Sequence, residues 1–306
     1  MEINMDNQNN SIKIGFIGVG APKCATTWIY KCLDEHPQIC MGRPKEIHFF
    51  NKDHGFDNPD VEWRYPKGMN YYFSHFSHCP KDAVIGEFSS KYMYDKNSAE
   101  LIKKHLPDVK IIMSLRNPAD RTFSQYNHTM SKTPGYFKNF ESALKDEPEL
   151  IEKSKYSEQI KRFLNFFPKE NILILIYEEI EKNPVKFIQS IYKFLNVNDD
   201  FVPNSALIKI NVSKARYSKS NKQAKLIIFR VYNFLKRIPV ISQLVAFVKS
   251  RGADVKIIKS IDKKTLKDKK TPALNPEMRE KLNKVFSEDI NETEKLLDRR
   301  IDAWHN

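Results

Sequence analysis

Four short apolar runs along the chain predict the buried strands of a sheet. Each run is six to eight residues long, is rich in Ile, Val and Leu, and lacks the regular polar alternation of a half-exposed strand. The runs are Ile12–Val19, Ala83–Phe88, Val109–Arg116 and Asn171–Tyr177. A pattern of helical period follows each one, at Thr26–Glu35, Ser98–Leu106, Ala119–Ser131 and Pro184–Leu195. Strands that alternate with helices indicate an α/β fold, with a central parallel sheet and helices on both faces.

The two ends of the chain differ in character. Residues 1–11 are polar and Asn-rich, so we expect them to be disordered, and we expect residues 12–306 to form a single domain. A terminal helix is predicted at about 276–298, because one face carries or approaches Leu282, Phe286, Ile290 and Leu297. Asn275 is the expected N-cap of this helix and Pro276 its first residue.

The net charge of +13 is concentrated in one segment. Residues 214–270 hold 17 Lys and Arg against 3 Asp and Glu, so the remaining 34 basic and 35 acidic residues nearly balance. This block, which includes a basic helical insert at about 221–271, is typical either of a solvated helical face or of contact with an anionic partner. Residues 226–248 are apolar, but Arg230 and Pro239 interrupt them, so a helical hairpin is predicted there instead of a membrane span. Peripheral contact of 214–270 with a membrane surface stays open.

Cysteine and histidine usage predicts neither a metal site nor a disulfide framework. The four Cys and eight His show no ligand spacing, and the Cys are too sparse for a disulfide-rich scaffold. The first residues lack the charged and then apolar pattern of a secretory signal. We therefore expect a cytoplasmic, reducing location, at the membrane surface if the basic block binds lipid.

The stretch GVGAPKCATTW at residues 18–28 predicts an anion cradle at the start of a helix. Its small residues let the backbone approach a ligand, and the N–H groups of Thr26–Trp28 point toward it. Lys23 adds a mobile positive charge, suited to negative charge that develops on a bridging oxygen. The loop differs from that of nucleotide triphosphatases, in which Lys directly precedes Ser or Thr. On the residues alone, a tight turn capped by Thr26 is an alternative, and Trp28 fits either a nucleobase or the core.

The stretch SLRNPADRTFSQY at residues 114–126 predicts a second anion site, at the end of a later strand. Arg116 lies at the strand end and Ser124 on the following helix, so guanidinium and hydroxyl can converge on one anion. Arg121 either binds the same anion or braces the turn through a salt bridge. Because ligands of such sheets bind beyond the carboxyl ends of the strands, we expect the two stretches to be neighbours. Two anion sites there suit a nucleotide with phosphates on both its 5′ and 3′ sides.

These two stretches resemble the sulfotransferases that use 3′-phosphoadenosine-5′-phosphosulfate (PAPS). APKCATTW resembles their 5′-phosphosulfate loop and RNPADRTFSQY their 3′-phosphate motif, although Ala25 stands where the family usually has Gly. The resemblance spans roughly residues 12–220 and 272–304 and implies a P-loop-like α/β domain, PAPS as donor and no metal. It implies that the donor is bound by Lys23, Cys24, Ala25, Thr26, Thr27, Trp28, Arg116 and Ser124, with Lys214, Arg216 and Tyr217 in a late basic loop.

Another stretch resembles the carbohydrate, heparan-type branch of this family. RPKEIHFF at residues 43–50 contains Glu46, which the resemblance makes the general base for the acceptor hydroxyl. His48 is the alternative base, expected to face the same way on a short strand. On the residues alone, Glu46 is as well explained by a pair with Arg43 or Lys45.

The sequence therefore predicts sulfuryl transfer from PAPS to a hydroxyl, of a carbohydrate or glycolipid, by in-line displacement. Lys23 would stabilise the leaving 5′-phosphate. One alternative is a P-loop-type nucleotide kinase, although the GK[ST] order and a magnesium-binding acid are missing. Another is an inactive glycan-binding relative, because GEFSSKYMY at residues 86–94 has Phe88 where the related GEKSPxYF has Lys. The sequence contains no nucleic-acid recognition motif, so no nucleic acid is expected as a partner.

Overall fold

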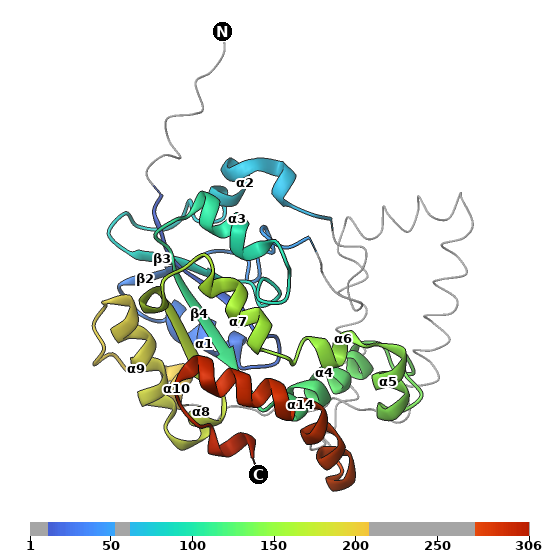
Figure 1. Ribbon diagram of the computed structural model, residues 1–306. Coiled ribbons are helices and arrows are strands. Elements are labelled where there is room, and N and C mark those ends of the chain that lie inside the picture. The colour runs from blue at the N-terminus through green and yellow to red at the C-terminus, as the bar shows by residue number, and fades with distance from the viewer. Residues whose placement is uncertain (1–11, 53–61, 208–272, 306) are drawn as a thin grey trace, which may run out of the picture. The chain divides into compact units, whose positions relative to one another are not determined.

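Five parallel strands form the sheet of the computed structural model, which describes residues 12–52, 62–207 and 273–305 (Figure 1). The strands are β1 (Ile14–Gly20), β2 (Ile39–Met41), β3 (Val84–Phe88), β4 (Lys110–Leu115) and β5 (Ile172–Ile176). Their order is β2-β3-β1-β4-β5, and every neighbouring pair is parallel. The chain turns from one half of the sheet to the other at β1. The carboxyl ends of β1 and β4 therefore frame the usual ligand position of an open α/β sheet.

Helices lie between and after the strands along the chain. They are α1 (Thr26–Asp34), α2 (Gly68–Ser74), α3 (Ser98–His105), α4 (Pro118–Lys132), α5 (Phe140–Asp146), α6 (Glu149–Glu152), α7 (Ser157–Leu164), α8 (Glu178–Lys182), α9 (Pro184–Leu195), α10 (Asn204–Leu207) and α14 (Pro276–Leu297). Short 3-10 turns lie at η2 (Tyr65–Lys67), η3 (Lys169–Asn171) and η5 (Asp302–Trp304). The crossover β1–α1–β2 runs along the sheet in the opposite direction to β3–α3–β4. Right-handed crossovers then place α1 on one face and α3 on the other.

The predicted P-loop-like α/β fold is confirmed, and the sequence located four of its five strands. The predicted helices after β1, β3, β4 and β5 begin within a residue of α1, α3, α4 and α9. The strand that the sequence missed is β2, because its three residues are too few to produce a pattern. The predicted start of α14 is also confirmed, since the Asn275 side chain accepts the Glu277 N–H at 2.8 Å and Pro276 is the first helical residue.

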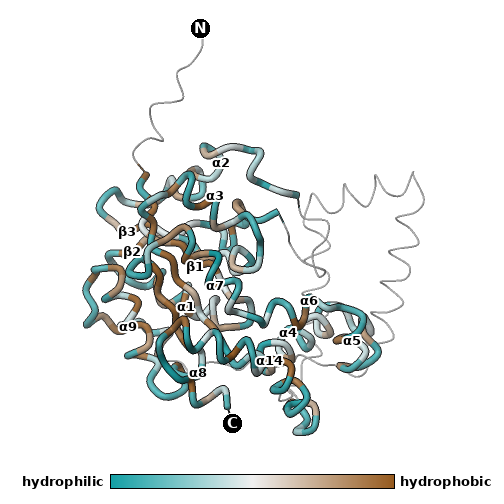
Figure 2. The backbone as a smooth tube through the Cα atoms, in the orientation of Figure 1, coloured by the Kyte–Doolittle hydropathy of each residue, from teal (hydrophilic) through white to brown (hydrophobic). Residues whose placement is uncertain are grey.

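A hydrophobic core fills the space between the sheet and the layer of α1 and α9. Figure 2 shows hydrophobic positions concentrated along the strands and α1. The strands contribute Phe16, Phe88, Ile112 and Leu175 to this core, and the two helices contribute Ile29, Leu33, Ile188 and Ile191. Burial of these apolar side chains is the main driving force that holds the strand ends in place.

The chain forms two compact units. Among the described residues, the first comprises 12–52, 62–125, 147–207 and 274–305 and contains the five-stranded sheet. The second includes residues 126–146, in which the centroid of the Tyr126 ring lies 5.0 Å from that of the Phe140 ring. The expected basic insert lies outside the described residues. Within the described ranges, the structure contains no helix of the length and hydropathy needed to cross a membrane.

Cys40 on β2 and Cys79 after α2 form a disulfide that the sequence analysis did not predict. The tertiary fold brings them together, because 39 residues separate them in sequence while their Cα atoms lie 5.7 Å apart. With His78 they make the one cluster of metal-ligand type in the described part of the chain, and its two sulfurs are bonded to each other. Disulfides persist in oxidising compartments. The bond therefore counts against the reducing location expected from cysteine spacing, and the cytoplasmic location stays a prediction.

Candidate active site

The loop after β1 is built around Gly20, because only glycine fits this position. Its φ is 153°, and a Cβ here would lie 2.7 Å from the Ser90 main-chain O and 2.8 Å from the Met93 Cβ. The following residue, Ala21, donates its N–H to the Ser114 main-chain O at 2.8 Å. The buried Ser114 hydroxyl in turn donates to the Cys24 main-chain O at 2.7 Å. These bonds fix the loop against the end of β4.

Two residues of this loop adopt the left-handed conformation that favours glycine. Lys23 has a φ of 72° and Ala25 a φ of 61°. A non-glycine residue there crowds its Cβ against the following carbonyl, at a cost of about 1–2 kcal/mol. Ala25 therefore stands at a position where the usual glycine would have two advantages, because glycine is smaller and adopts this conformation without strain.

The loop runs directly into the N-terminus of α1. Ala25 is the N-cap, and its main-chain O accepts the N–H of Trp28 at 2.8 Å. The alternative of Thr26 as N-cap is wrong, because Thr26 is the first helical residue and is buried. The amide of Trp28 is used within the turn, whereas the N–H groups of Thr26 and Thr27 have no acceptor inside the helix. The anion cradle predicted from the sequence therefore has two first-turn amides beside Lys23.

Side chains of this loop also serve the core. Burial raises the pKa of the Cys24 thiol to about 12, although Arg121 and Arg116 oppose that rise. Cys24 is thus a neutral, buried thiol, and only its main chain is available to a ligand. The Trp28 indole donates to the Ser205 main-chain O at 2.8 Å, and its ring lies 5.9 Å from that of Phe187. These contacts favour the packing interpretation of Trp28, while its contact with the nucleotide stays a prediction.

Arg116 follows β4 and is half-buried. Its guanidinium carbon lies 4.5 Å from the centroid of the Tyr177 ring, which supports the side chain from one side. Its Nε is buried and has no hydrogen-bond partner among the residues that the structure places. A partly desolvated cation with an unused N–H is a strong anion ligand. Ser124, half-buried on α4, is the hydroxyl predicted to share that anion.

Arg121 braces the turn. It is fully buried, and it donates through Nε to the Ser154 hydroxyl at 2.5 Å and through Nη2 to the Leu150 main-chain O at 3.0 Å. Thr122 joins the same cluster, since its hydroxyl lies 2.6 Å from that of Ser154. The structure supports a bracing role for Arg121, but through these neutral partners instead of the expected salt bridge, and its buried Nη1 has no hydrogen-bond partner among the described residues.

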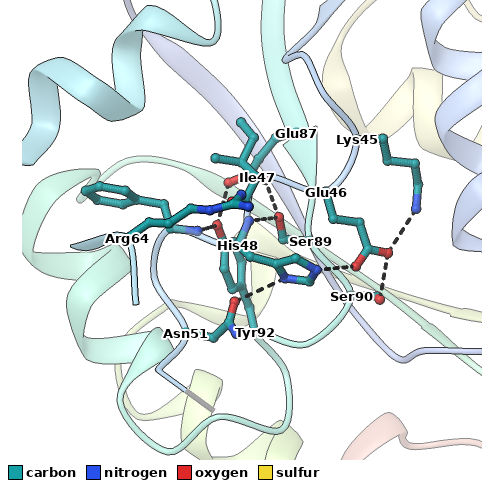
Figure 3. A network of polar contacts seen from close by, with 11 residues as sticks. Lys45, Glu46, Ile47, His48, Asn51, Arg64, Glu87, Ser89, Ser90 and Tyr92 are labelled. Carbon is teal, nitrogen blue, oxygen red and sulfur yellow. Dashed lines mark hydrogen bonds and ion pairs between the residues drawn. The ribbon is translucent and has the colours of Figure 1, made fainter. Parts of the chain in front are cut away.

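Glu46 lies at the centre of a polar network (Figure 3). Its Oε1 lies 3.0 Å from the Lys45 Nζ and accepts from the Ser90 hydroxyl at 2.8 Å, and its Oε2 lies 2.9 Å from the His48 Nε2. Burial by itself would raise the pKa of Glu46. The hydrogen bond from His48, the charge of Lys45 and the Ser90 hydroxyl outweigh burial and hold that pKa well below its usual range. Glu46 is therefore ionised at neutral pH, as a general base must be.

The structure qualifies two expectations about Glu46. The pair with Lys45 exists, whereas Arg43 lies 3.6 Å from the Asp34 carboxylate instead. The short strand expected to carry Glu46 and His48 does not form, and His48 has a φ of 53°. An ionised carboxylate only accepts hydrogen bonds, so the His48 Nε2 must carry the proton in this pair. With Nε2 used in this contact, His48 holds Glu46, and the assignment of Glu46 as the base stays a prediction.

Glu46 and the anion loop meet at one end of the sheet. The Ser90 hydroxyl holds Glu46, and the Ser90 main-chain O is the atom that leaves no space for a side chain at Gly20. The turn after β3 is itself fixed to β1, because the N–H groups of Ser89 and Met93 donate to the main-chain O atoms of Gly18 and Val19 at 2.9 and 2.8 Å. Two stretches predicted separately from the sequence are therefore joined through Ser90.

The structure does not place every predicted site residue. Lys214, Arg216 and Tyr217 lie outside the described residues, so their contact with the nucleotide stays a prediction. Phe88 is buried in the core on the α1 face, so no cation replaces the usual lysine at that position. Sequence reasoning missed further residues of the Glu46 network, namely Asn51, Arg64, Glu87, Ser89, Ser90 and Tyr92. Four of these six fall within the GEFSSKY stretch, whose resemblance was the available signal.

A predicted anion loop beside a hydrogen-bonded carboxylate, at one end of a parallel sheet, is a site suited to group transfer. Comparison with known proteins identifies the family. The sulfotransferase domain family matches residues 15–294. The chain belongs to this family and is a sulfotransferase. The alternatives of a nucleotide kinase and of an inactive glycan-binding relative are not favoured.

Individual relatives agree with this assignment. The chain is 28% identical over 208 residues to the human bifunctional heparan sulfate N-deacetylase/N-sulfotransferase 2, a match that covers 60% of this chain and 22% of that protein. It is 23% identical over 274 residues to the membrane-associated sulfotransferase kil1 of Dictyostelium discoideum, covering 60% of this chain and 56% of that protein. The chain thus spans between a fifth and just over half of these relatives. A sulfotransferase crystal structure from Alicyclobacillus acidocaldarius shares the fold, with a TM-score of 0.68, 24% identity and coverage of 96% of this chain and 100% of that one.

Proposed function

We propose that this protein transfers the sulfuryl group of PAPS to a hydroxyl of a carbohydrate or glycolipid, by in-line displacement with Glu46 as general base. The observation that carries the proposal is the position of Glu46, ionised and joined through Ser90 to the glycine that opens the anion loop. A base beside a phosphate-type cradle is what transfer from a phosphosulfate to a hydroxyl requires.

The residues of the loop fit the 5′ side of such a donor. The N–H groups of Thr26 and Thr27 at the start of α1 would bind the phosphosulfate oxygens. Lys23 would neutralise the charge that grows on the bridging oxygen as its bond to sulfur breaks. The two hydrogen bonds through Ser114 keep this loop rigid, so these donors are preorganised.

Arg116 and Ser124 fit the 3′-phosphate. The guanidinium, supported by Tyr177, has a buried N–H to offer, and a neutral nucleotide edge would leave that group unused. A preference for a nucleotide with a 3′-phosphate over 5′-AMP would follow from this single contact.

In the transfer step the acceptor oxygen forms a bond to sulfur while sulfur leaves the bridging oxygen. The acceptor proton passes to Glu46, whose carboxylate must loosen one of its bonds to Lys45, Ser90 or His48 to take it. Those bonds lower the basicity of Glu46 in the free protein. We therefore assign Lys45 and His48 to holding the base until the acceptor arrives.

The carbohydrate acceptor is proposed from the RPKEIHFF stretch and from the names of the relatives. The human relative is named as a heparan sulfate N-sulfotransferase, so a sugar amine is the second acceptor group to test. The location at a membrane surface is proposed from the basic block at 214–270, and one relative is named as membrane-associated.

Two measurements test the proposal. Calorimetric titration with 3′,5′-adenosine bisphosphate should show micromolar binding, far tighter than that of 5′-AMP or of ATP with magnesium. Transfer of label from PAPS to desulfated heparan sulfate, with its amines either free or acetylated, should then reveal the acceptor group. Equal binding of ATP, or no binding of the bisphosphate, would remove the basis of the proposal.

A further inference from the structure

The segment that carries Glu46 and His48 is held by side chains instead of by strand pairing. Arg64 donates to the Ile47 main-chain O. The His48 N–H donates to the Ser89 hydroxyl at 2.9 Å, and the Phe49 N–H donates to the Tyr92 hydroxyl at 2.8 Å. Two successive peptide groups, Ile47–His48 and His48–Phe49, therefore depend on side chains for these hydrogen bonds. The left-handed φ of His48 makes this support necessary, because such a conformation persists only where its surroundings fix it.

Glu87 lies next to this segment and accepts hydrogen bonds from the same two hydroxyls, those of Ser89 and Tyr92 (Figure 3). It accepts from Ser89 at 2.6 Å, from Tyr92 at 3.0 Å and from Tyr72 at 3.2 Å. Glu87 is 1% exposed, so it cannot touch a substrate. Burial raises the pKa of its carboxyl, and the three hydroxyl bonds oppose that rise.

The direction of these bonds follows from the number of protons. A hydroxyl has one proton and two lone pairs. When Ser89 and Tyr92 give their protons to Glu87, each turns a lone pair toward the peptide N–H groups of the segment. Without an acceptor beneath them, both protons would be buried without a partner, and the hydroxyls would turn toward other acceptors.

We propose that Glu87 is a positioning residue, which orients Ser89 and Tyr92 so that they hold the His48 and Phe49 amides and thereby keep His48 against Glu46. The inference rests on the proposed function, because it assigns Glu87 a role in the same transfer. A purely structural role for Glu87 would make all three of its hydroxyl partners equivalent. The proposed role predicts instead that the hydroxyls of Ser89 and Tyr92 matter for turnover and that the hydroxyl of Tyr72 does not.

Tyr92→Phe and Tyr72→Phe form a matched pair that tests this. Both tyrosines are fully buried and both donate to the same Glu87 oxygen, but only Tyr92 accepts a peptide N–H of the segment. We expect Tyr92→Phe to lower kcat for label transfer from PAPS by at least about tenfold, because small displacements of reacting groups are costly. Tyr72→Phe should stay within about threefold of the parent. Binding of 3′,5′-adenosine bisphosphate should be unchanged in both variants, since neither tyrosine lies in the anion loop.

Hydrogen exchange makes the inference testable apart from activity. Exchange of the His48 and Phe49 amides should accelerate in Tyr92→Phe and in Glu87→Gln, and stay slow in Tyr72→Phe. Equal kcat losses in the two tyrosine variants, or equal exchange, would overturn the inference even if the parent transfers sulfate. If the parent transfers none while exchange separates the pair, the holding role stands and the proposed function falls. The tyrosine pair decides the matter if Glu87→Gln does not fold.

Discussion

Arg116 and Arg121 belong to one motif, yet alanine at the first position should weaken ligand binding, whereas alanine at the second should lower stability. Each has a buried nitrogen without a hydrogen-bond partner among the described residues, but Arg116 is half-buried at the end of β4, whereas Arg121 is fully buried and braces the turn through Ser154 and Leu150. We expect Arg116→Ala to weaken binding of 3′,5′-adenosine bisphosphate with little change in stability. We expect Arg121→Ala to reduce the free energy of unfolding.

The magnitudes follow from the contacts of each side chain. Arg116→Ala loses the contact with the Tyr177 ring, worth about 0.5–1 kcal/mol in a partly exposed setting. It also loses a charge-assisted bond to phosphate, worth about 1.5–3 kcal/mol, which corresponds to about 10- to 140-fold in affinity. Arg121→Ala removes one donor from the Leu150 O and one from the Ser154 hydroxyl, both of which keep contacts with Thr122, and opens a cavity, at a cost of about 2–4 kcal/mol.

Calorimetry and urea unfolding of the two variants measure these quantities separately. Titration with the bisphosphate and with 5′-AMP should show that Arg116→Ala loses most of the preference for the 3′-phosphate. The urea midpoint should move markedly only in Arg121→Ala. If Arg116→Ala bound the bisphosphate as tightly as the parent, Arg116 would not be the 3′-phosphate ligand. An unchanged urea midpoint in Arg121→Ala would refute the bracing role.

Three further predictions concern the base and the loop. Glu46→Gln should reduce label transfer by at least about 100-fold and leave bisphosphate affinity unchanged; near-full activity would remove Glu46 as the base. Because the pKa of Glu46 is lowered in the folded protein, its contribution to stability is complete above the unfolded value of 4.5 and is lost as pH falls below it. Acid unfolding curves should therefore be less steep in Glu46→Gln than in the parent. Ala25→Gly should change the free energies of bisphosphate binding and of unfolding by no more than about 1 kcal/mol. Ala25→Val should weaken binding and lower stability, because a β-branched residue is strained in the left-handed conformation of this position. Calorimetric titration measures the binding of each variant, and urea unfolding measures its stability.

Local sequence patterns were sufficient for four of the five strands, for the helices that follow them and for the class of chemistry. Apolar runs placed β1, β3, β4 and β5, and helical periods with Asn275 and Pro276 placed α14. These signals are local, because a strand or a helix start depends on residues only a few positions apart. The two anion stretches could be read in the same way. Strand–helix junctions create such sites from consecutive residues.

Tertiary structure decided which side chains meet. The Ser90–Glu46 and Tyr92–Phe49 hydrogen bonds span 44 and 43 residues, and the Cys40–Cys79 disulfide spans 39. No local pattern encodes these pairs, because they depend on how the turn after β3 docks on β1 and on how the segment after β2 returns to it. Burial likewise separated Arg116 from Arg121 within a single motif. The sequence alone therefore determined most of the sheet, its following helices and the kind of site. Long-range packing determined the partners of Glu46, because strand register and burial arise only when distant segments come together.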